Sequence, residues 1–268
     1  MISFPLQWRA AMCQLLGMNC NVPTDIVFSF TGFHRRGGDT DQHADGWGIA
    51  FYEGVGCRLF LDTTPAAESP VAALVRSYPI RSLNVIAHIR KATVGRVALE
   101  NTHPFVREMW GRYWTFAHNG TLPGLRVARP GRDRRFAAVG TTDSEAAFCE
   151  LLETLWHRFP GQQPGAADLF HAVEECASML GALGDLNFLL SNGEVLFARA
   201  ATKLAYIVRQ APFTTARLLD ADYEVDFSEL TTPQDRVAVI ATVPLTDNEA
   251  WTEIPAGTLL MFRDGAPV

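Results

Sequence analysis

A cysteine at position 13 follows directly on a methionine, and a cysteine thiol can serve as the nucleophile of an enzyme that attacks carbonyl groups. A single cysteine is more often a small buried hydrophobic residue without a chemical role. Cys13 therefore gains weight only if other parts of the chain supply groups that act on a carbonyl substrate.

The sequence His118-Asn119-Gly120 offers two such groups at the end of a predicted strand. The side-chain amide of Asn119 and the backbone N–H of Gly120 could point at one spot. Two donors so placed stabilise the oxyanion that forms when a carbonyl is attacked. Asn-Gly is also a common turn former without any catalytic role, so the motif alone fits both interpretations.

Two charged residues are suited to hold the charged groups of an amino acid. Arg90 closes a predicted strand, and a guanidinium can bind a carboxylate through two parallel hydrogen bonds. Asp143 could pair with an α-ammonium group. Both have simpler explanations: Arg90 as a solvated surface residue, and Asp143 as an acid favoured in a first helical turn by the helix dipole.

The segment Asp45-Gly46-Trp47-Gly48 places small residues on both sides of a tryptophan, which lets the backbone approach another surface closely. It could equally be the plain entry to a hairpin. His34, His43 and Asp45 lie close in sequence, but neither helical spacing nor a cysteine supports a metal site. We expect no metal.

A layered scaffold must position these residues. Strands come first, then two long helices, then strands again, which indicates α+β architecture in place of alternating βαβ units. Strands are predicted at 48–53, 57–62, 83–90, 113–117, 188–190, 195–198, 204–209, 236–242 and 259–262. Helices are predicted at 26–33, capped near Thr24, and at 70–78, 143–159 and 166–183; Thr142 and Glu145 form a capping box before the third.

Composition narrows the class of protein. The 268 residues are 48% hydrophobic and 19% charged, which is typical of a globular protein with a full core. The net charge of −6 disfavours nucleic acid as a partner, because phosphate binding needs a concentrated basic face. The basic stretch at 129–135 is short and is interpreted as an exposed loop.

The cysteines and the apolar runs indicate in which compartment of the cell the protein is expected. Five cysteines form no CxxC pair, and their odd number leaves one unpaired in any disulfide scheme. The first twelve residues do not form a signal peptide, and no apolar run approaches membrane-spanning length. We therefore expect a soluble cytoplasmic protein without a membrane partner.

Taken in order, the motifs resemble those of the class II, N-terminal-nucleophile glutamine amidotransferases, and most closely the stand-alone YafJ-type branch, which lacks a fused synthase domain. Each motif is weak alone, and their order and spacing make the match specific. The motifs are Met12-Cys13, Asp45-Gly46-Trp47-Gly48, Arg90-Lys91-Ala92-Thr93, Asn101-Thr102-His103-Pro104-Phe105, His118-Asn119-Gly120 and Thr142-Asp143-Ser144-Glu145. The implied fold is a four-layer αββα sandwich.

The resemblance implies a role for each matching residue. Cys13 is expected to be the nucleophile, with its own α-amino group as general base, and Asn119 and Gly120 are expected to form the oxyanion hole. The substrate carboxylate end is expected to be held by Arg90 and Thr93, and its ammonium by Asp143. His103 is expected to support the glutamine pocket. No cofactor is implied.

One feature departs from the family pattern. Twelve residues precede Cys13, and a peptide bond between Met12 and Cys13 turns the α-amine into an amide that cannot accept a proton. We expect an extension at 1–12 and a single amidotransferase domain at 13–268. Either translation begins at Met12 and methionine removal exposes Cys13, or the extension is cleaved.

Three functions remain open at this stage. The first is glutamine hydrolysis through a Cys13 thioester, with ammonia passed to an unidentified acceptor or synthase partner. The second keeps the site but acts on γ-glutamyl amides or peptides. The third is a catalytically silent subunit that binds a partner protein.

Overall fold

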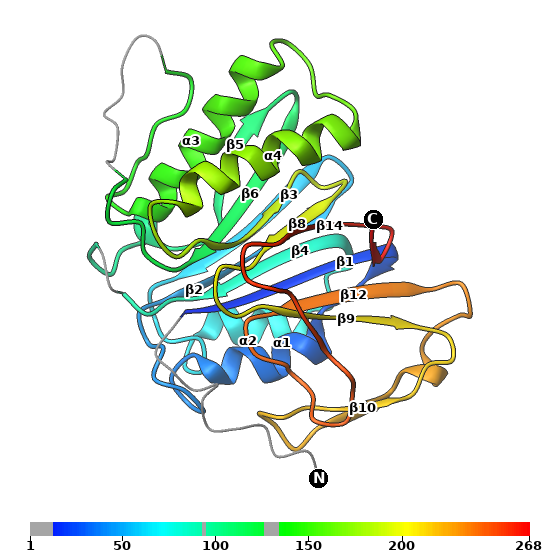
Figure 1. The fold of residues 1–268 in the computed structure, drawn as a ribbon. Helices are drawn as coiled ribbons and strands as arrows, with labels where there is room; N and C mark the ends of the chain where they lie inside the picture. The colour runs from blue at the N-terminus through cyan, green and yellow to red at the C-terminus, as the bar shows by residue number, and fades with distance from the viewer. Residues whose placement is uncertain (1–12, 93–94, 126–133) are drawn as a thin grey trace.

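The computed structural model describes residues 13–92, 95–125 and 134–268, and its two sheets are stacked face to face between two layers of helices (Figure 1). Every strand pairing it records is antiparallel. The layers follow the order αββα, which confirms the predicted fold class. None of the described helices has the length and apolar character that a membrane crossing requires.

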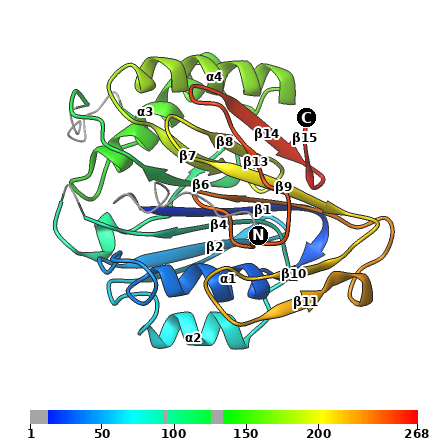
Figure 2. The same ribbon diagram turned by 60° about the horizontal axis from the view of Figure 1, so that its bottom comes forward.

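The larger sheet has seven strands with β1 at its centre. In order across the sheet they are β13 (Thr252–Glu253), β9 (Ala205–Gln210), β12 (Arg236–Ala241), β1 (Gln14–Thr24), β4 (Ser82–Ile89), β2 (Trp47–Glu53) and β3 (Gly56–Asp62). Its outer face is covered by α1 (Val27–Phe33) and α2 (Pro70–Ser77), and by the ribbon of β10 (Thr215–Arg217) and β11 (Glu224–Asp226) (Figure 2).

The smaller sheet has six strands and carries the two long helices on its outer face (Figure 1). Its order is β15 (Ala266–Pro267), β14 (Leu259–Arg263), β8 (Leu196–Arg199), β7 (Asn187–Ser191), β6 (Arg112–Asn119) and β5 (Phe105–Met109). The helices are α3 (Asp143–Arg158) and α4 (Ala166–Gly181), and short 3₁₀ turns lie at η2 (His34–Arg36), η3 (Leu99–Asn101) and η4 (Phe227–Glu229).

Apolar side chains fill all three spaces between the four layers. Phe148 belongs to the cluster between α3, α4 and the smaller sheet, Leu189 to the cluster between the sheets, and Phe30 to the cluster under α1 and α2. All three side chains are fully buried. Such burial is the main driving force for stacking the layers, and it fixes the strand ends that carry the motifs.

The sequence patterns did not predict β1, although it is the central strand. It contains Gly17, Asn19, Asn21 and Pro23, whose residue types are depleted in strands. Pairing with β4 on one side and β12 on the other overrides this preference. A Cβ on Gly17 would press on Leu189 at 3.1 Å, so the glycine allows the smaller sheet to approach closely.

Two predicted boundaries were wrong. Thr24 does not cap the first helix, because it is the last residue of β1; instead the Asp25 carboxylate accepts a hydrogen bond from the Val27 N–H at 3.1 Å. The strand predicted at 113–117 continues through Asn119, since His118 and Asn119 still pair with β7. The predicted hairpin of β2 and β3 and all four predicted helices are confirmed.

Candidate active site

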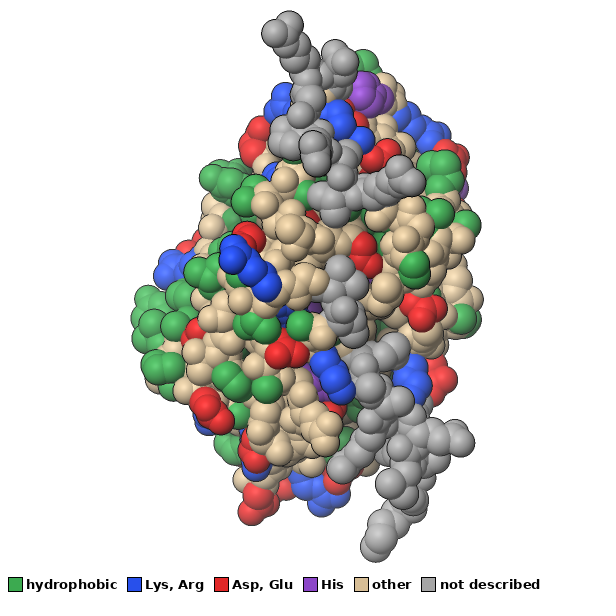
Figure 3. Space-filling view, turned by 90° about the vertical axis from the view of Figure 1, so that its left-hand side faces the viewer, with side chains coloured by type: hydrophobic (Ala, Val, Ile, Leu, Met, Phe, Trp, Pro, Cys, Tyr) green, Lys and Arg blue, Asp and Glu red, His purple; other side chains and the backbone are tan. Residues whose placement is uncertain are grey.

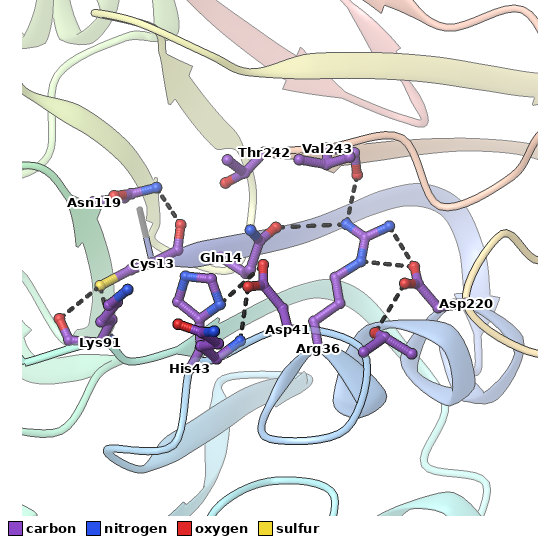
Figure 4. Close-up of polar contacts among 12 residues, drawn as sticks. Cys13, Gln14, Arg36, Asp41, His43, Lys91, Asn119, Asp220, Thr242 and Val243 are labelled. Atoms are coloured by element: carbon purple, nitrogen blue, oxygen red, sulfur yellow. Dashed lines mark hydrogen bonds and ion pairs between the residues drawn. The ribbon is translucent and has the colours of Figure 1, made fainter. Parts of the chain in front are cut away.

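β1 begins at the side of the molecule on the left of Figure 1, and Cys13 stands directly before its first residue (Figure 4). Its Sγ donates to the Lys91 carbonyl oxygen at 3.3 Å and accepts from the Lys91 N–H at 3.1 Å. Burial raises the pKa of the Cys13 thiol, and the Lys91 N–H and the Arg90 guanidinium only partly offset this. The sulfur is therefore protonated at neutral pH, so it needs a base before it can attack.

Asn119 ends β6 with its side-chain amide directed at Cys13 (Figure 4). The amide Nδ2 donates a hydrogen bond to the Cys13 carbonyl oxygen. The backbone of Asn119 is held in turn by Asn187, whose Nδ2 donates to the Asn119 carbonyl oxygen at 2.9 Å. A strong amide donor thus lies beside the candidate nucleophile.

Gly120 follows with a backbone that favours glycine. Its φ is 146°, and a Cβ there would overlap the carbonyl oxygen of Asp185. His118 reinforces this turn, because its Nε2 lies 3.0 Å from the same carbonyl oxygen and its Nδ1 lies 2.8 Å from the Ser144 hydroxyl. The contact with Ser144 joins the end of β6 to α3, and burial lowers the pKa of His118, which favours the neutral ring.

Arg90 lies just beyond β4 and is only 3% exposed, so it is not the solvated surface residue of the simpler interpretation. Its Nη1 donates to the Arg96 carbonyl oxygen at 3.1 Å, and its Nη2 to that of Gly95 at 3.3 Å. Burial lowers the pKa of Arg90, opposed by the charges of Cys13 and Asp45. The Arg90 guanidinium therefore lies close enough to the Cys13 thiol to interact with it electrostatically.

Asp45 was predicted only as part of a close backbone approach, and the structure gives its side chain a contact as well. One carboxylate oxygen accepts from the Ala92 N–H at 2.8 Å, which fixes the segment that leads from Arg90. The close approach itself is confirmed at Gly48, where a Cβ would overlap the carbonyl oxygen of His103. Trp47 between them is completely buried.

Asp143 is the first residue of α3 and is half-buried. One of its carboxylate oxygens accepts from the Leu122 N–H at 2.7 Å, and the other from the Ser144 N–H at 2.9 Å. Leu122 lies two residues after Gly120, so this carboxylate is tied to the loop that follows the candidate oxyanion hole. Each oxygen keeps a lone pair with which it could accept from a substrate ammonium.

The two remaining predicted site residues are His103 and Thr93. His103 is buried against His88, with ring centroids 4.3 Å apart, and against Phe105 at 4.4 Å. His103 therefore underlies β4, the strand that leads to Arg90, and contact with a substrate stays a prediction. Thr93 lies outside the described residues. Within the described ranges, no group of three or more His, Cys, Asp or Glu side chains is arranged to hold a metal ion.

Comparison with known proteins fits this geometry. Residues 12–268 match the family described as glutamine amidotransferases class-II. The chain belongs to the class II glutamine amidotransferases. It is 54% identical over 257 residues to YafJ of Escherichia coli (strain K12), a protein assigned by name to the glutamine amidotransferases, and this match covers 96% of the chain and all of YafJ. The predicted YafJ-type branch is thereby confirmed.

Solved structures support the same assignment. The crystal structure of a predicted glutamine amidotransferase from Pseudomonas aeruginosa PA01 superposes with a TM-score of 0.75 at 47% identity, covering 96% of this chain and 99% of that one. The glutamine phosphoribosylpyrophosphate amidotransferase of Bacillus subtilis has a TM-score of 0.56 at 15% identity, covering 96% of this chain and 48% of that one. The second likeness concerns the fold alone.

Sequence reasoning missed a buried ion pair near Cys13, here called the charged clamp, which joins Arg36 to Asp220 (Figure 4). Arg36 is 4% exposed and pairs with Asp220 at 2.7 Å. Its Nη1 donates to the Val243 carbonyl oxygen at 2.8 Å and lies 3.5 Å from the Gln14 side-chain oxygen. Leu15 is fixed from the same loop, because its N–H donates to the Thr242 hydroxyl at 2.9 Å. The clamp therefore anchors the first residues of β1.

Asp220→Asn is expected to destabilise the protein by about 3–5 kcal/mol, because it leaves the buried Arg36 guanidinium without its carboxylate. Urea unfolding measures the change. Asp39→Asn is the matched control: it removes an exposed ion pair with the neighbouring Arg35, which is worth about 0–1 kcal/mol. Equal losses in the two variants would show that the clamp is no stronger than a surface pair.

The buried histidines of this amidotransferase make it sensitive to acid. Burial, with smaller effects from His118 and Arg90, lowers the pKa of His88 to about 3, and burial also holds the pKa of His103 well below its ordinary value. Between pH 6.5 and about 3 the unfolded chain binds protons that the folded His88 does not. The neutral, buried His88 therefore costs no stability above pH 6.5. As the pH is lowered through this window, the free energy of unfolding falls.

The expected loss from His88 alone is about 2 kcal/mol between pH 6.5 and pH 5, since each pH unit in the window costs on the order of 1.4 kcal/mol. Denaturant unfolding at several pH values measures it. His88→Phe should show a shallower decline than the parent protein. A His88→Phe slope equal to the parent's would contradict the assignment.

Figure 3 views the side of the molecule on which β1 begins. Basic and acidic side chains are interspersed on this face, with apolar ones among them, and form no extended basic field on the part that the structure describes.

Proposed function

We propose that the protein hydrolyses the side-chain amide of glutamine through a Cys13 thioester, releasing glutamate and ammonia for an acceptor or synthase partner. The observation that supports this most directly is the convergence of the Cys13 thiol, the Asn119 amide and the buried Arg90 around the start of β1. The free cysteines, including Cys13, also suit the reducing cytoplasm that we propose as its location.

The proposed base is the α-amino group of Cys13 itself. The raised pKa of the thiol means that a proton must be removed from sulfur, and His118 is already engaged by Ser144 and Asp185. An α-amine titrates near pH ~8, so a useful fraction is unprotonated at neutral pH. We therefore propose that the catalytic domain is 13–268 and that residues 1–12 are absent from the active protein, in keeping with a family match that begins at Met12.

The reaction would run in two halves. The α-amine takes the thiol proton, sulfur bonds to the amide carbon, and the carbonyl electrons move to oxygen, where Asn119 and Gly120 donate hydrogen bonds. Collapse of this intermediate breaks the C–N bond, and the ammonium returns the proton to the leaving ammonia. Water then cleaves the thioester, with the α-amine as base, and gives glutamate and the free thiol.

The substrate ends would be held by the remaining site residues. Arg90, together with Thr93, would bind the carboxylate of glutamine, and Asp143 would accept from its ammonium. His103 would support this pocket from beneath β4. The alternatives are a γ-glutamyl amide or peptide in place of glutamine, and a silent partner-binding subunit.

One experiment separates these functions. Protein that begins at Cys13 is given glutamine, and ammonia and glutamate are measured beside amine release from γ-glutamyl dipeptides. Diazo-oxo-norleucine, a glutamine-like electrophile, is used in parallel to label Cys13. Preference for glutamine supports the proposal, preference for the dipeptides assigns the alternative substrate, and absence of both turnover and labelling leaves a silent subunit.

Asp143→Asn is expected to raise KM for glutamine by about 10- to 100-fold and to change kcat little, because a hydrogen bond to a charged group contributes roughly 1.5–3 kcal/mol. Glutaramate, which lacks the α-ammonium, should be hydrolysed equally by parent and variant. Asp168→Asn, an exposed acid in the first turn of α4, is the control for a helix-dipole effect. An equal loss with glutaramate would show that Asp143 acts on structure and not on the ammonium.

A further inference from the structure

A cavity lies at the end of β1 that is opposite to Cys13. Its volume is about 550 Å³, within the range of roughly 300–1,000 Å³ that is typical of small-molecule sites. The last residues of β1, the start of α1, strand β12 and the segment around β11 and η4 enclose it. Figure 2 shows the β10–β11 ribbon beside α1. At about 3.3 Å per residue, Val22 lies roughly 30 Å from Cys13 along the strand.

The interior of this cavity is lined by aromatic and aliphatic side chains. Phe28 and Phe227 line it with ring centroids 5.3 Å apart, packed edge to face. The Arg209 guanidinium lies 5.5 Å from the Phe28 ring centre and 4.9 Å from that of Phe227. Two hydrogen bonds of 2.8 and 2.6 Å bind Arg209 to Glu249, which neutralises its charge. The Arg209–Glu249 pair therefore backs the aromatic wall without adding net charge to it.

The rim holds one cation and one anion side by side. Thr24 of β1 pairs with Ser82 of β4, and the residues next to this pair, Asp25 and Arg81, both line the cavity at this edge. Across the described residues, Arg81 has no carboxylate within ion-pair distance. One oxygen of Asp25 accepts from the Val27 N–H, which leaves the other for a ligand.

A third charged residue at the rim, Asp235, already accepts two hydrogen bonds. Both oxygens of Asp235 accept from Thr232, one from the backbone N–H at 3.0 Å and one from the hydroxyl at 2.7 Å. Asp25 holds one such hydrogen bond, from the Val27 N–H, so Asp25 and Arg81 keep more bonding capacity for a ligand than Asp235 does.

We infer that this cavity binds an α-amino acid with an apolar side chain. The ligand carboxylate pairs with Arg81, its ammonium with Asp25, and its side chain packs against the wall formed by Phe28 and Phe227. A molecule with both charges next to an apolar body meets all three features at once. A purely apolar ligand would form no ion pair with Arg81 or Asp25. A simple anion could pair with Arg81, but the Asp25 carboxylate would repel it.

The inferred site is separate from the proposed glutamine site in place and in chemistry. The two lie at opposite ends of β1, and the second one has an aromatic interior in place of a thiol and an oxyanion hole. Binding at the second site therefore does not depend on the proposed reaction of Cys13, and it can be tested on protein that does not turn over glutamine.

Isothermal titration of the full chain with phenylalanine tests the inference. Two derivatives serve as probes of the rim: N-acetylphenylalanine lacks the ammonium, and phenylalaninamide lacks the carboxylate. Each is expected to bind about tenfold or more weakly than phenylalanine, because each loses one hydrogen-bonded charge. N-acetylphenylalanine binding as tightly as phenylalanine would overturn the role of Asp25.

Variants assign the binding to this cavity. Arg81→Ala and Asp25→Asn should each weaken phenylalanine binding about tenfold, whereas Arg263→Ala removes an exposed arginine from β14 and should leave it unchanged. Asp143→Asn should also leave it unchanged, which excludes binding at the glutamine site. Val225→Trp fills the cavity from β11 and should abolish binding. No phenylalanine binding to the parent, or unaltered binding to Arg81→Ala, overturns the inference.

Discussion

Protein that begins at Cys13 is expected to release ammonia from glutamine at least about 100-fold faster than protein that retains residues 1–12. A positioned general base contributes typically 10²–10⁴-fold to such a reaction, and a peptide bond to Met12 removes the basicity of the Cys13 nitrogen. The structure makes this dependence strong, because burial raises the pKa of the thiol and the sulfur cannot ionise unaided at neutral pH.

Expression from the Met12 codon, followed by methionine removal, gives the short form, and mass spectrometry confirms both N-termini before ammonia release is compared. The short form with Cys13→Ala sets the background rate. If protein shown to start at Met1 turns over glutamine as fast as the short form, the α-amine is not the base. Another group near Cys13 would then have to take the proton.

The elements with strong local patterns were predictable from sequence. The β2–β3 hairpin has two strand-like runs joined by a turn with glycines at 54 and 56, and α3 combines helical spacing with the Thr142 cap, whose hydroxyl accepts from the Glu145 N–H at 3.2 Å. In both cases the information lies within about fifteen consecutive residues. β1 differs because its strand character comes from neighbours that are distant in sequence, β4 and β12.

The candidate site was predictable to the extent that its residues stand in motifs. The order of the motifs indicated that Cys13, Arg90 and Asn119 belong together, and the structure brings these three into one place. Arg36 and Asp220 carry no such signal. They are 184 positions apart, and neither stands in a motif, so only the folded chain shows that they anchor the start of β1.

Asn119→Ala is expected to lower kcat for glutamine hydrolysis by about 10²–10³-fold, equivalent to roughly 3–4 kcal/mol of barrier, and to leave KM nearly unchanged. The reason is that the Asn119 amide already points at Cys13, so its N–H can reach an oxyanion formed on the attacked carbonyl. That charge is present only after attack, and its loss therefore affects the transition state and not substrate binding.

The same amide bonds to the Cys13 carbonyl oxygen, so a positioning role must be distinguished from oxyanion stabilisation. Iodoacetamide alkylation of Cys13, followed on its peptide by mass spectrometry, needs the thiol but forms no oxyanion. Asn119→Ala should alkylate at the parent rate while turnover falls. A parallel fall in both rates would mean that Asn119 holds the nucleophile in place, and the donor for the oxyanion would then have to be sought at Gly120 alone.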